Sequence, residues 1–381
     1  MRILLVSSSS GSRGGGEIFL LYLAEGLKDS GHTVGLWLAA HPRMDELARL
    51  FAPFGPVLRA PYRNTYDHWH RGLLTSASTR TARQFVSSWM EWRPDVMHFN
   101  KQNLEDGLDL LAAANALPVP HLCTVHITQS ARFLRARFAG WRDAKARRAL
   151  RAYRGPLVAV ASARAAELSE FVSSNASVRA INNGVPVIDA APTDRVALRA
   201  REGLRPDSLA IVAVGRLEAQ KCPLRFLDRA ARIREAIPHA EFRWIGSGRL
   251  TPEWDAGVAA RNLGGAVRRI DWREDVRGAL PAYDVFLHSA AYEGLPLAVL
   301  EAMAAGLPCI VEQNVLTQLP ASLQACAFAA TDDTNWKALL ENRAQLDDRA
   351  QRGREIVRAE FSTAAMGRAY AAIYQELCAS R

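Results

Sequence analysis

Short apolar runs recur along the whole chain, and stretches with helical spacing lie between them. Each run predicts a buried strand, and helices between successive strands favour parallel sheets covered by helices on both faces. The predicted strands are residues 3–7, 33–38, 95–99, 121–126, 157–160, 209–214, 241–245, 267–270, 284–288 and 308–311. We therefore expect an α/β protein in which each half of the chain forms one Rossmann-like, doubly wound sheet.

The two series of predicted strands are separated by a segment rich in turn-forming residues. Residues 182–186 contain an Asn-Gly pair and residues 189–194 are polar, which makes this segment the predicted linker. With 381 residues, two domains are the default expectation. We place the first at residues 1–186 and the second from residue 187. Because ligands of open α/β sheets bind beyond the carboxyl ends of the strands, we expect a site in the cleft between the domains.

Composition favours a soluble enzyme over a disordered or membrane protein. Hydrophobic residues make up 49% and charged residues 23%, close to the average for soluble chains. No apolar run reaches the length of a membrane span, and the first strand is too short for a signal-peptide core. The cysteines are scattered and odd in number, so a reduced, cytoplasmic setting is expected, without a structural disulfide or zinc site. They are Cys123, Cys222, Cys309, Cys326 and Cys378.

Positive charge is concentrated in the first half of the chain. Residues 1–186 hold 23 of the 48 Lys and Arg but only 14 of the 39 Asp and Glu, whereas the second half is neutral. The excess gathers between Arg132 and Arg154, where nine cations and four aromatic residues surround one acid, Asp143. This segment resembles a basic amphipathic helix. Such a helix either binds anionic lipid or a phosphorylated acceptor, or is a solvated surface helix, and the pattern leaves both open. Nucleic acid is not expected, because no recognition motif accompanies the charge.

Two loops after predicted strands have the chemistry of phosphate-binding sites. Residues 10–17 are rich in glycine and precede a predicted helix, so that exposed N–H groups there suit an anion; the alternative is a plain turn. Arg216 and Lys221 follow the strand that ends at residue 214, and two cations at that position suit a diphosphate; the alternative is a solvated loop. Gly246, after the next strand, is a further point of close backbone approach.

Two more strand ends carry side chains that can contact a substrate. His126 ends an apolar run, where an imidazole can orient a hydroxyl or stabilise charge, although most such histidines are structural. Glu301 lies within a helix predicted to hold Pro296 in its first turn and to stop at Gly306. Since a buried carboxylate needs compensation, this Glu in an apolar helix is expected to face a polar ligand. Glu293 lies just before the helix, beside its positive end.

Together these motifs resemble glycosyltransferase family 4, the retaining, nucleotide-sugar-dependent transferases of the GT-B fold, over essentially the whole chain. Residues 293–308 are similar to the family's Glu-x7-Glu signature, residues 214–221 to its diphosphate segment and residues 14–17 to its glycine loop. His126 falls where the family has its active-site His. In the family the final helix returns to the first domain, which here implies that the second domain ends at residue 360 and that residues 361–381 form that helix.

The resemblance implies a role for each site residue. Arg216 and Lys221 are expected to hold the donor diphosphate, Glu293 the sugar hydroxyls and Glu301 the ribose. Gly15, Gly16, Gly246, Gly294 and Leu295 complete the expected donor site. His126 is expected beside the reacting carbon, so that His126, Glu293, Arg216 and Lys221 are the candidate catalytic residues.

The implied reaction is transfer of a hexosyl group from a UDP- or GDP-sugar to the hydroxyl of a saccharide or lipid-linked saccharide, in polysaccharide or lipopolysaccharide synthesis. No metal and no cofactor are expected, since Asp-x-Asp is absent and the two cations can stabilise the leaving diphosphate. The enzyme is expected in the cytoplasm, on the inner face of the membrane if the basic segment binds lipid.

Some residues depart from the family pattern, and two other functions stay open. Cys222 stands where a Gly commonly follows the Lys, Ile127 replaces a frequent Asp, and Trp272 a frequent Gly. Residues 312–319 replace the expected Gly-Gly loop and its acid. A sugar-nucleotide 2-epimerase would share the fold and the nucleotide site. A non-catalytic, basic membrane-surface protein on a degenerate transferase fold is the third interpretation.

Overall fold

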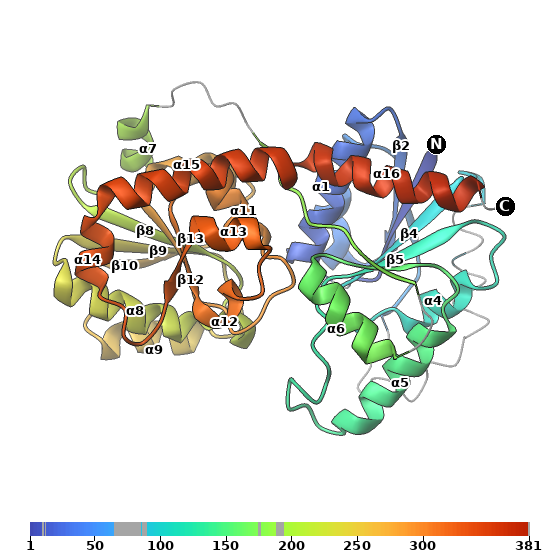
Figure 1. Cartoon of the computed structure of the whole chain (residues 1–381), viewed down its shortest axis with the longest axis horizontal. Coiled ribbons are helices and arrows are strands. Elements are labelled where there is room, and N and C mark those ends of the chain that lie inside the picture. The colour runs from blue at the N-terminus through green and yellow to red at the C-terminus, as the bar shows by residue number, and fades with distance from the viewer. Residues whose placement is uncertain are drawn as a thin grey trace. The chain divides into compact units, whose positions relative to one another are not determined.

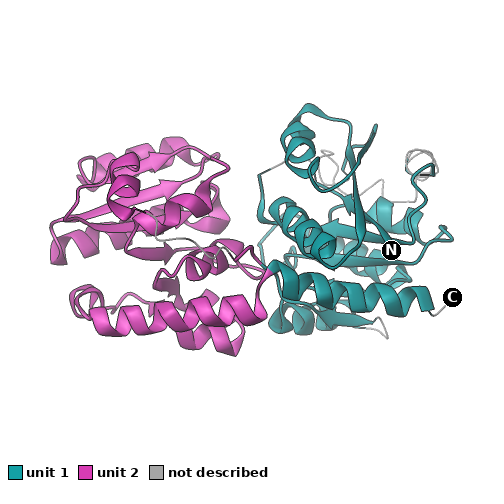
Figure 2. Ribbon diagram, turned by 90° about the horizontal axis from the view of Figure 1, so that it is seen from above, with its two compact units in different colours: residues 1–184, 363–381 teal, residues 185–362 magenta. Residues whose placement is uncertain are grey.

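The computed structural model describes residues 1–9, 11, 13–64, 85, 90–173, 177–187 and 194–379, which form two compact units (Figure 2). Unit 1 comprises Met1–Gly184 and Thr363–Arg381, and unit 2 comprises Val185–Ser362. The boundary between the units falls within the predicted turn segment 182–186. Of the polar stretch 189–194, all but Asp194 lies outside the described residues.

Unit 1 contains a parallel sheet of seven strands in the order β3-β2-β1-β4-β5-β6-β7 (Figure 1). Its central strands β1 and β4 are buried on both faces, which explains the apolar run of β1, whereas β4 also buries the polar residues His98, Asn100 and Lys101. The strands are β1 (Arg2–Ser7), β2 (Thr33–Ala39), β3 (Val57–Ala60), β4 (Val96–Lys101), β5 (His121–Val125), β6 (Leu157–Ala159) and β7 (Val178–Ala180). The helices are α1 (Gly15–Asp29), η1 (Pro42–Met44), α2 (Asp45–Phe51), α4 (Leu108–Ala114), α5 (Ala139–Ala152), α6 (Ser162–Val172) and α16 (Thr363–Ala379).

Helices cover both faces of the unit 1 sheet. Because side chains alternate along a strand, one face of β4 and β5 presents apolar residues that pack with α4, α5 and α6. The other face presents His98 and Thr124 toward α16, where the His98 imidazole lies 2.6 Å from the Tyr374 hydroxyl and the Thr124 hydroxyl 2.9 Å from that of Tyr370. Helix α16, from the end of the chain, is thus part of the fold of unit 1, packed beside α1 (Figure 1).

Unit 2 contains a parallel sheet of six strands in the order β10-β9-β8-β11-β12-β13. The strands are β8 (Leu209–Val214), β9 (Ala240–Ile245), β10 (Val267–Ile270), β11 (Val285–His288), β12 (Cys309–Glu312) and β13 (Ala327–Ala330). The helices are α7 (Arg195–Arg201), η3 (Ala219–Lys221), α8 (Pro223–Ala236), α9 (Thr251–Ala260), α10 (Val276–Ala279), η4 (Leu280–Ala282), α11 (Leu297–Ala304), α12 (Gln313–Leu316), α13 (Ala321–Cys326), α14 (Trp336–Glu341) and α15 (Arg343–Glu360).

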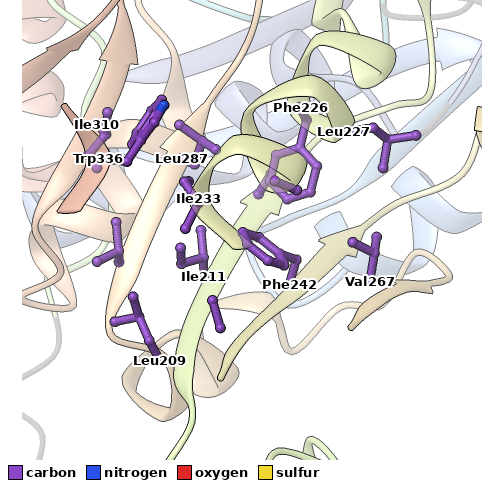
Figure 3. Packing of buried hydrophobic residues seen from close by; sticks show 14 of the residues in the cluster. Leu209, Ile211, Phe226, Leu227, Ile233, Phe242, Val267, Leu287, Ile310 and Trp336 are labelled. Atoms are coloured by element: carbon purple, nitrogen blue, oxygen red, sulfur yellow. The ribbon is translucent and has the colours of Figure 1, made fainter. Parts of the chain in front are cut away.

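The core of unit 2 lies between this sheet and helices α8, α9 and α14. Phe226 and Ile233 of α8 pack over the strand residues Ile211 and Phe242 (Figure 3), and the Trp254 ring of α9 stacks on Phe226 at 5.9 Å. The predicted α/β fold with two doubly wound sheets is confirmed. Among the described helices, none is both long and apolar enough to cross a bilayer.

All ten predicted strands exist, and three further strands were not predicted. These three are β3, β7 and β13, each of three or four residues and each at the edge of its sheet. Strands β3 and β7 are mostly half-buried or exposed, so their sequences need not form apolar runs, whereas β13 is apolar and mostly buried and was missed although it carries that signal. Residues 178–180, for example, are all partly or fully exposed.

The basic segment is helical only in part, which corrects the interpretation of residues 132–154 as one amphipathic helix. Helix α5 begins at Ala139, and residues 131–138 form turns in which Arg135 and Phe138 have φ angles of 52° and 55°. Left-handed backbone at two residues interrupts a right-handed helix. The aromatic and basic pattern therefore continues across a loop and a helix.

Candidate active site

In unit 2 the loops after β8 and β9 are joined through their backbones. The N–H group of Gly215 donates to the Ile245 carbonyl at 3.0 Å, and that of Leu217 donates to the Ser247 carbonyl at 3.1 Å. Gly246 has φ +136°, and a Cβ atom there would lie 2.2 Å from the carbonyl oxygen of Gly215. Only glycine allows both this conformation and this approach. Gly246 therefore shapes the backbone beside Arg216.

The loop after β8 and the loop after β11 meet at a buried ion pair. The ammonium Nζ of Lys221 lies 2.5 Å from Oε1 of Glu293, with side-chain exposures of 18% and 8%. Nε2 of His288, the last residue of β11, lies 3.2 Å from the same oxygen, without the alignment of a full hydrogen bond. The Gln220 amide donates to the Tyr292 carbonyl at 3.1 Å. Two motifs some 72 residues apart thus form one cluster.

This cluster keeps Glu293 ionised. Burial by itself would raise the pKa of the Glu293 carboxyl group, but the charge of Lys221 and the contacts with His288 and Lys221 lower that pKa to about 2. Burial also lowers the pKa of His288, so that its imidazole is neutral near pH 7. The cluster therefore has one cation and one anion and no net charge.

Arg216 differs from Lys221, although the sequence suggests the same role for both. Its side chain is exposed just beyond β8, and no ion pair with another described residue holds it. The neighbouring Glu218 is held by the Arg249 guanidinium at 2.7 Å. Arg216 is thus a cation available to an anionic ligand, whereas Lys221 already forms an ion pair with Glu293.

Cys222 shows why this position suits glycine. It has φ +47° and connects η3 to the proline that begins α8. A side chain at positive φ is strained, whereas glycine is not. The chain accommodates the cysteine without losing the turn that places Lys221. Ile127 and Trp272, the other two departures, are both partly buried.

The carboxylate that is truly buried is Glu293, and this corrects the argument made for Glu301. Glu301 lies on α11 but is partly exposed, while its neighbours Leu300 and Ala302 are buried. Partial exposure lowers the desolvation cost that was expected to require a ligand. The helix also starts one residue later than predicted, with Pro296 as its N-cap, and it ends before Gly306 at φ +78°. Gly294 and Leu295 are buried in the turn before the helix.

In unit 1, His126 lies directly after β5 and is held by an amide. Its Nε2 is 2.7 Å from Oδ1 of Asn100, whose Nδ2 donates to the Gly16 carbonyl at 3.0 Å. The Phe19 ring contacts the imidazole edge-on at 4.7 Å. Burial lowers the pKa of His126 to about 4, against a smaller opposing effect of Asp106. The neutral imidazole therefore donates from Nε2 to Asn100 and keeps the lone pair of Nδ1.

The glycine loop enters α1 beside this histidine. Gly15 opens the helix, and a Cβ atom there would meet nothing within 4 Å, whereas one on Gly16 would lie 2.0 Å from the Gln102 amide. Glu17 is buried and accepts a hydrogen bond from the Ser9 hydroxyl. This carboxylate thus supports the loop. Residues 10 and 12 lie outside the described residues.

Three residues that contact these sites were not predicted as site residues: Asn100, Asp106 and His288. Asp106 accepts from the backbone N–H groups of Gln102 and Asn103 at 3.0 and 2.9 Å and so holds the loop after β4. Asn100 and His288 lie at the carboxyl ends of β4 and β11. The rule that ligands bind at such ends could have selected both residues.

Replacing Asn100 with alanine is expected to lower the free energy of unfolding by about 1–3 kcal/mol, because it leaves buried polar groups on His126 and Gly16 without partners. If His126 acts on the substrate, kcat should fall further than the stability loss explains. Chemical unfolding and turnover measure the two effects. The control is Asn115→Ala, which removes comparable bonds to the Ala152 carbonyl and the Arg154 N–H at a less buried site. Equal losses of activity in both variants would contradict a positioning role for Asn100.

No group of three or more potential metal-binding His, Cys, Asp or Glu side chains occurs in the part of the chain that the structure describes. Unit 2 carries the cations Arg216 and Lys221, the carboxylate Glu293 and the glycine backbone at Gly246, and unit 1 places His126 beside the glycine loop. The two Rossmann-like units define the class of the fold, which is the GT-B type.

Comparison with known families identifies the chain further. Residues 13–188 match the family described as Glycosyltransferase Family 4, and residues 208–338 match the Glycosyl transferases group 1. The chain therefore belongs to the family 4-like glycosyltransferases of the GT-B type, and the suspected resemblance is confirmed.

Two bacterial proteins are similar in sequence to part of the chain. The chain is 36% identical over 149 residues to the UDP-Gal:alpha-D-GlcNAc-diphosphoundecaprenol alpha-1,3-galactosyltransferase of Escherichia coli, and 30% identical over 148 residues to the putative glycosyltransferase EpsF of Bacillus subtilis. Each match spans 38% of this chain and 38% of the relative.

Solved structures match over almost the full length. Anabaena HepE in complex with UDP superposes with a TM-score of 0.77 at 17% identity, covering 99% of this chain and 100% of that one. Sucrose-phosphate synthase from Thermosynechococcus elongatus gives 0.78 at 19% identity, covering 100% of both chains. At such identities the likeness establishes the fold.

Proposed function

We propose that this protein is a retaining glycosyltransferase that moves a hexosyl group from a nucleoside diphosphate sugar to an acceptor hydroxyl. The bond between the anomeric carbon and the diphosphate oxygen breaks, and the acceptor oxygen bonds to that carbon on the same face. The acceptor proton passes to the departing diphosphate. The observation that carries this proposal is the Lys221–Glu293 ion pair beside the exposed Arg216 at the carboxyl ends of β8 and β11.

The cations are suited to a leaving diphosphate. Arg216 can bind two phosphate oxygens through its planar guanidinium, and Lys221 adds a point charge. Both stabilise the negative charge that grows as the glycosidic bond breaks, which is work that a metal ion performs in other enzymes. We therefore propose that the reaction needs no metal and no cofactor.

The carboxylates are suited to hydroxyl groups. Glu293, fixed by Lys221, has its second oxygen 3.4 Å from the Gln220 amide and can accept from a sugar hydroxyl. Glu301, partly exposed on α11, is assigned to the ribose. In unit 1 the lone pair of His126 Nδ1 can accept from a hydroxyl of the transferred sugar.

For the donor we propose a UDP-sugar. Anabaena HepE was solved with UDP, and the E. coli relative is named for UDP-galactose. For the acceptor we propose a saccharide, free or lipid-linked, in bacterial surface polysaccharide or lipid-linked glycan synthesis. The named E. coli relative acts on a diphosphoundecaprenol-linked sugar.

Thermal unfolding with a panel of UDP- and GDP-sugars tests the donor assignment. A donor present at about 100 times its dissociation constant stabilises by about 2.7 kcal/mol, which should raise Tm by roughly 3 °C if the chain unfolds as one unit and by roughly 7 °C if unit 2 unfolds separately. UMP, which lacks the second phosphate, is the control and should have a much smaller effect. If no nucleotide sugar raises Tm more than UMP does, the donor site is wrong. Product analysis with and without acceptor and chelator then separates transfer from epimerisation and tests the need for metal.

A further inference from the structure

Large apolar side chains are exposed together at one place in unit 1. Phe133, Leu134, Phe138 and Trp141 are 61%, 39%, 73% and 46% exposed, and they lie within nine residues of each other in the chain. We call these four residues the aromatic patch. The other large hydrophobic side chains exposed among the described residues are scattered: Met90, Val196 and Leu224.

The loop that carries the patch is held from inside. The buried Asp143 carboxylate on α5 accepts from the backbone N–H groups of Ala131 and Arg132 at 2.7 and 3.1 Å. The Leu134 N–H donates to the Ser130 carbonyl at 3.0 Å. The single acid of the segment is therefore used to fix the loop and adds no negative charge to the surface.

The cations of the segment divide into two sets. Arg142 forms a two-bond pair with Glu105 at 2.7 and 2.6 Å, and Arg147 donates to the Phe171 carbonyl at 2.7 Å. Arg151 likewise donates to carbonyls at the end of α6. These three cations bind unit 1 itself.

In the second set, two cations contact rings of the aromatic patch. Arg137 lies 5.4 Å from the centre of the Phe138 ring, and the Lys145 ammonium lies 5.2 Å from that of Trp141. Arg132, Arg135 and Arg148 are also exposed, as is Arg154 beyond the end of α5. The patch thus consists of apolar rings with cations around them.

We propose that the aromatic patch docks unit 1 on an anionic lipid surface. Exposed phenylalanine and tryptophan rings insert at the boundary between headgroups and acyl chains, while the surrounding arginines contact lipid phosphates. Each cation near an anionic membrane raises the membrane affinity about fivefold. The free energy of binding from the cations adds to that from the inserted rings. A soluble protein partner would also cover apolar side chains. Between residues 132 and 148, however, several cations and no acid are exposed, and this favours a uniformly negative surface. This proposal is independent of the reaction proposed above.

Vesicle flotation of the full chain tests it, with vesicles of phosphatidylcholine alone and with about 30% phosphatidylglycerol. The triple variant Phe133→Ser/Phe138→Ser/Trp141→Ser and the pair Arg135→Glu/Arg137→Glu should each lower binding to the anionic vesicles tenfold or more. The matched controls lie in unit 2: Val196→Ser/Leu224→Ser for the rings and Lys337→Glu/Arg343→Glu for the charges. Neither control should change binding more than twofold. Raising salt to about 0.5 M should weaken binding by wild type.

Several results would overturn the proposal. Equal binding to neutral and anionic vesicles would show that the cations do not contact lipid phosphates. Full binding by the triple variant would show that the rings do not insert into the membrane. If the charge pair lost binding while the triple variant kept it, the surface would be a polyanion site and not a membrane dock. Circular dichroism and thermal unfolding of each variant separate loss of binding from loss of fold.

Discussion

Replacing Lys221 with methionine is expected to lower the free energy of unfolding by about 3–5 kcal/mol, because the Glu293 carboxylate would stay buried without its cation. The same change removes a charge proposed to stabilise the leaving diphosphate, and turnover should fall by about 100-fold or more. Chemical unfolding at pH 7 and a donor turnover assay measure the two effects. The control is Lys337→Met, an exposed cation on α14, which should cost less than about 0.5 kcal/mol.

The ionisation of Glu293 makes the free energy of unfolding depend on pH. In the wild type the pKa of Glu293 is lowered from 4.5 to about 2, so the ionised form favours the folded state. This contribution is fully present above about pH 4.5 and is lost as pH falls toward 2. In Lys221→Met the pKa of Glu293 should rise, so that the stability deficit should be largest at pH 7 and shrink on acidification. A deficit that does not change between pH 7 and pH 4 would contradict the ion-pair explanation.

Replacing Glu293 with glutamine is expected to separate donor binding from turnover. The amide keeps the shape but not the charge, and a hydrogen bond to a charged group is worth about 1.5–3 kcal/mol, so kcat/KM should fall about 10- to 100-fold. UDP binding should be retained or strengthened, since Lys221 is then free for the diphosphate. Calorimetric UDP binding and steady-state kinetics measure the two.

The matched control is Glu218→Gln, which removes the charge of another carboxylate near Arg216 that is held by Arg249. It should leave kcat/KM within a few fold. The double variant Lys221→Met/Glu293→Gln should be more stable than Lys221→Met alone, because no buried charge is left unpaired. If UDP binding were lost in Glu293→Gln but turnover per bound donor were unchanged, the assignment of Glu293 to the sugar would be wrong.

The sequence predicted the fold well because buried strands leave a strong local signal. The runs at residues 209–214 and 241–245 are buried on both faces of the sheet and were recognised as β8 and β9, although Glu241 and Arg243 interrupt the second run. The missed strands β3, β7 and β13 are sheet edges of three or four residues, and burial places few demands on the residues of β3 and β7, although β13 is mostly buried. The loop at residues 131–138, which Asp143 holds, was also missed. Its two left-handed residues, Arg135 and Phe138, are not glycines, so the sequence carries no signal of a break in the helix.

The sequence alone selected the strand ends that carry the candidate site residues, since Arg216, Lys221, His126 and Glu293 each follow a predicted strand and the resemblance to the family rests on their spacing. Only the tertiary structure decided which of these groups neutralise one another. Lys221 and Glu293 meet because β8 and β11 are neighbours in the sheet, while Arg216 stays exposed and Asn100 holds His126. The physical reason is that burial and charge pairing are properties of neighbours in space. The pattern of a single segment cannot show whether a carboxylate such as Glu301 or one such as Glu293 is the buried one.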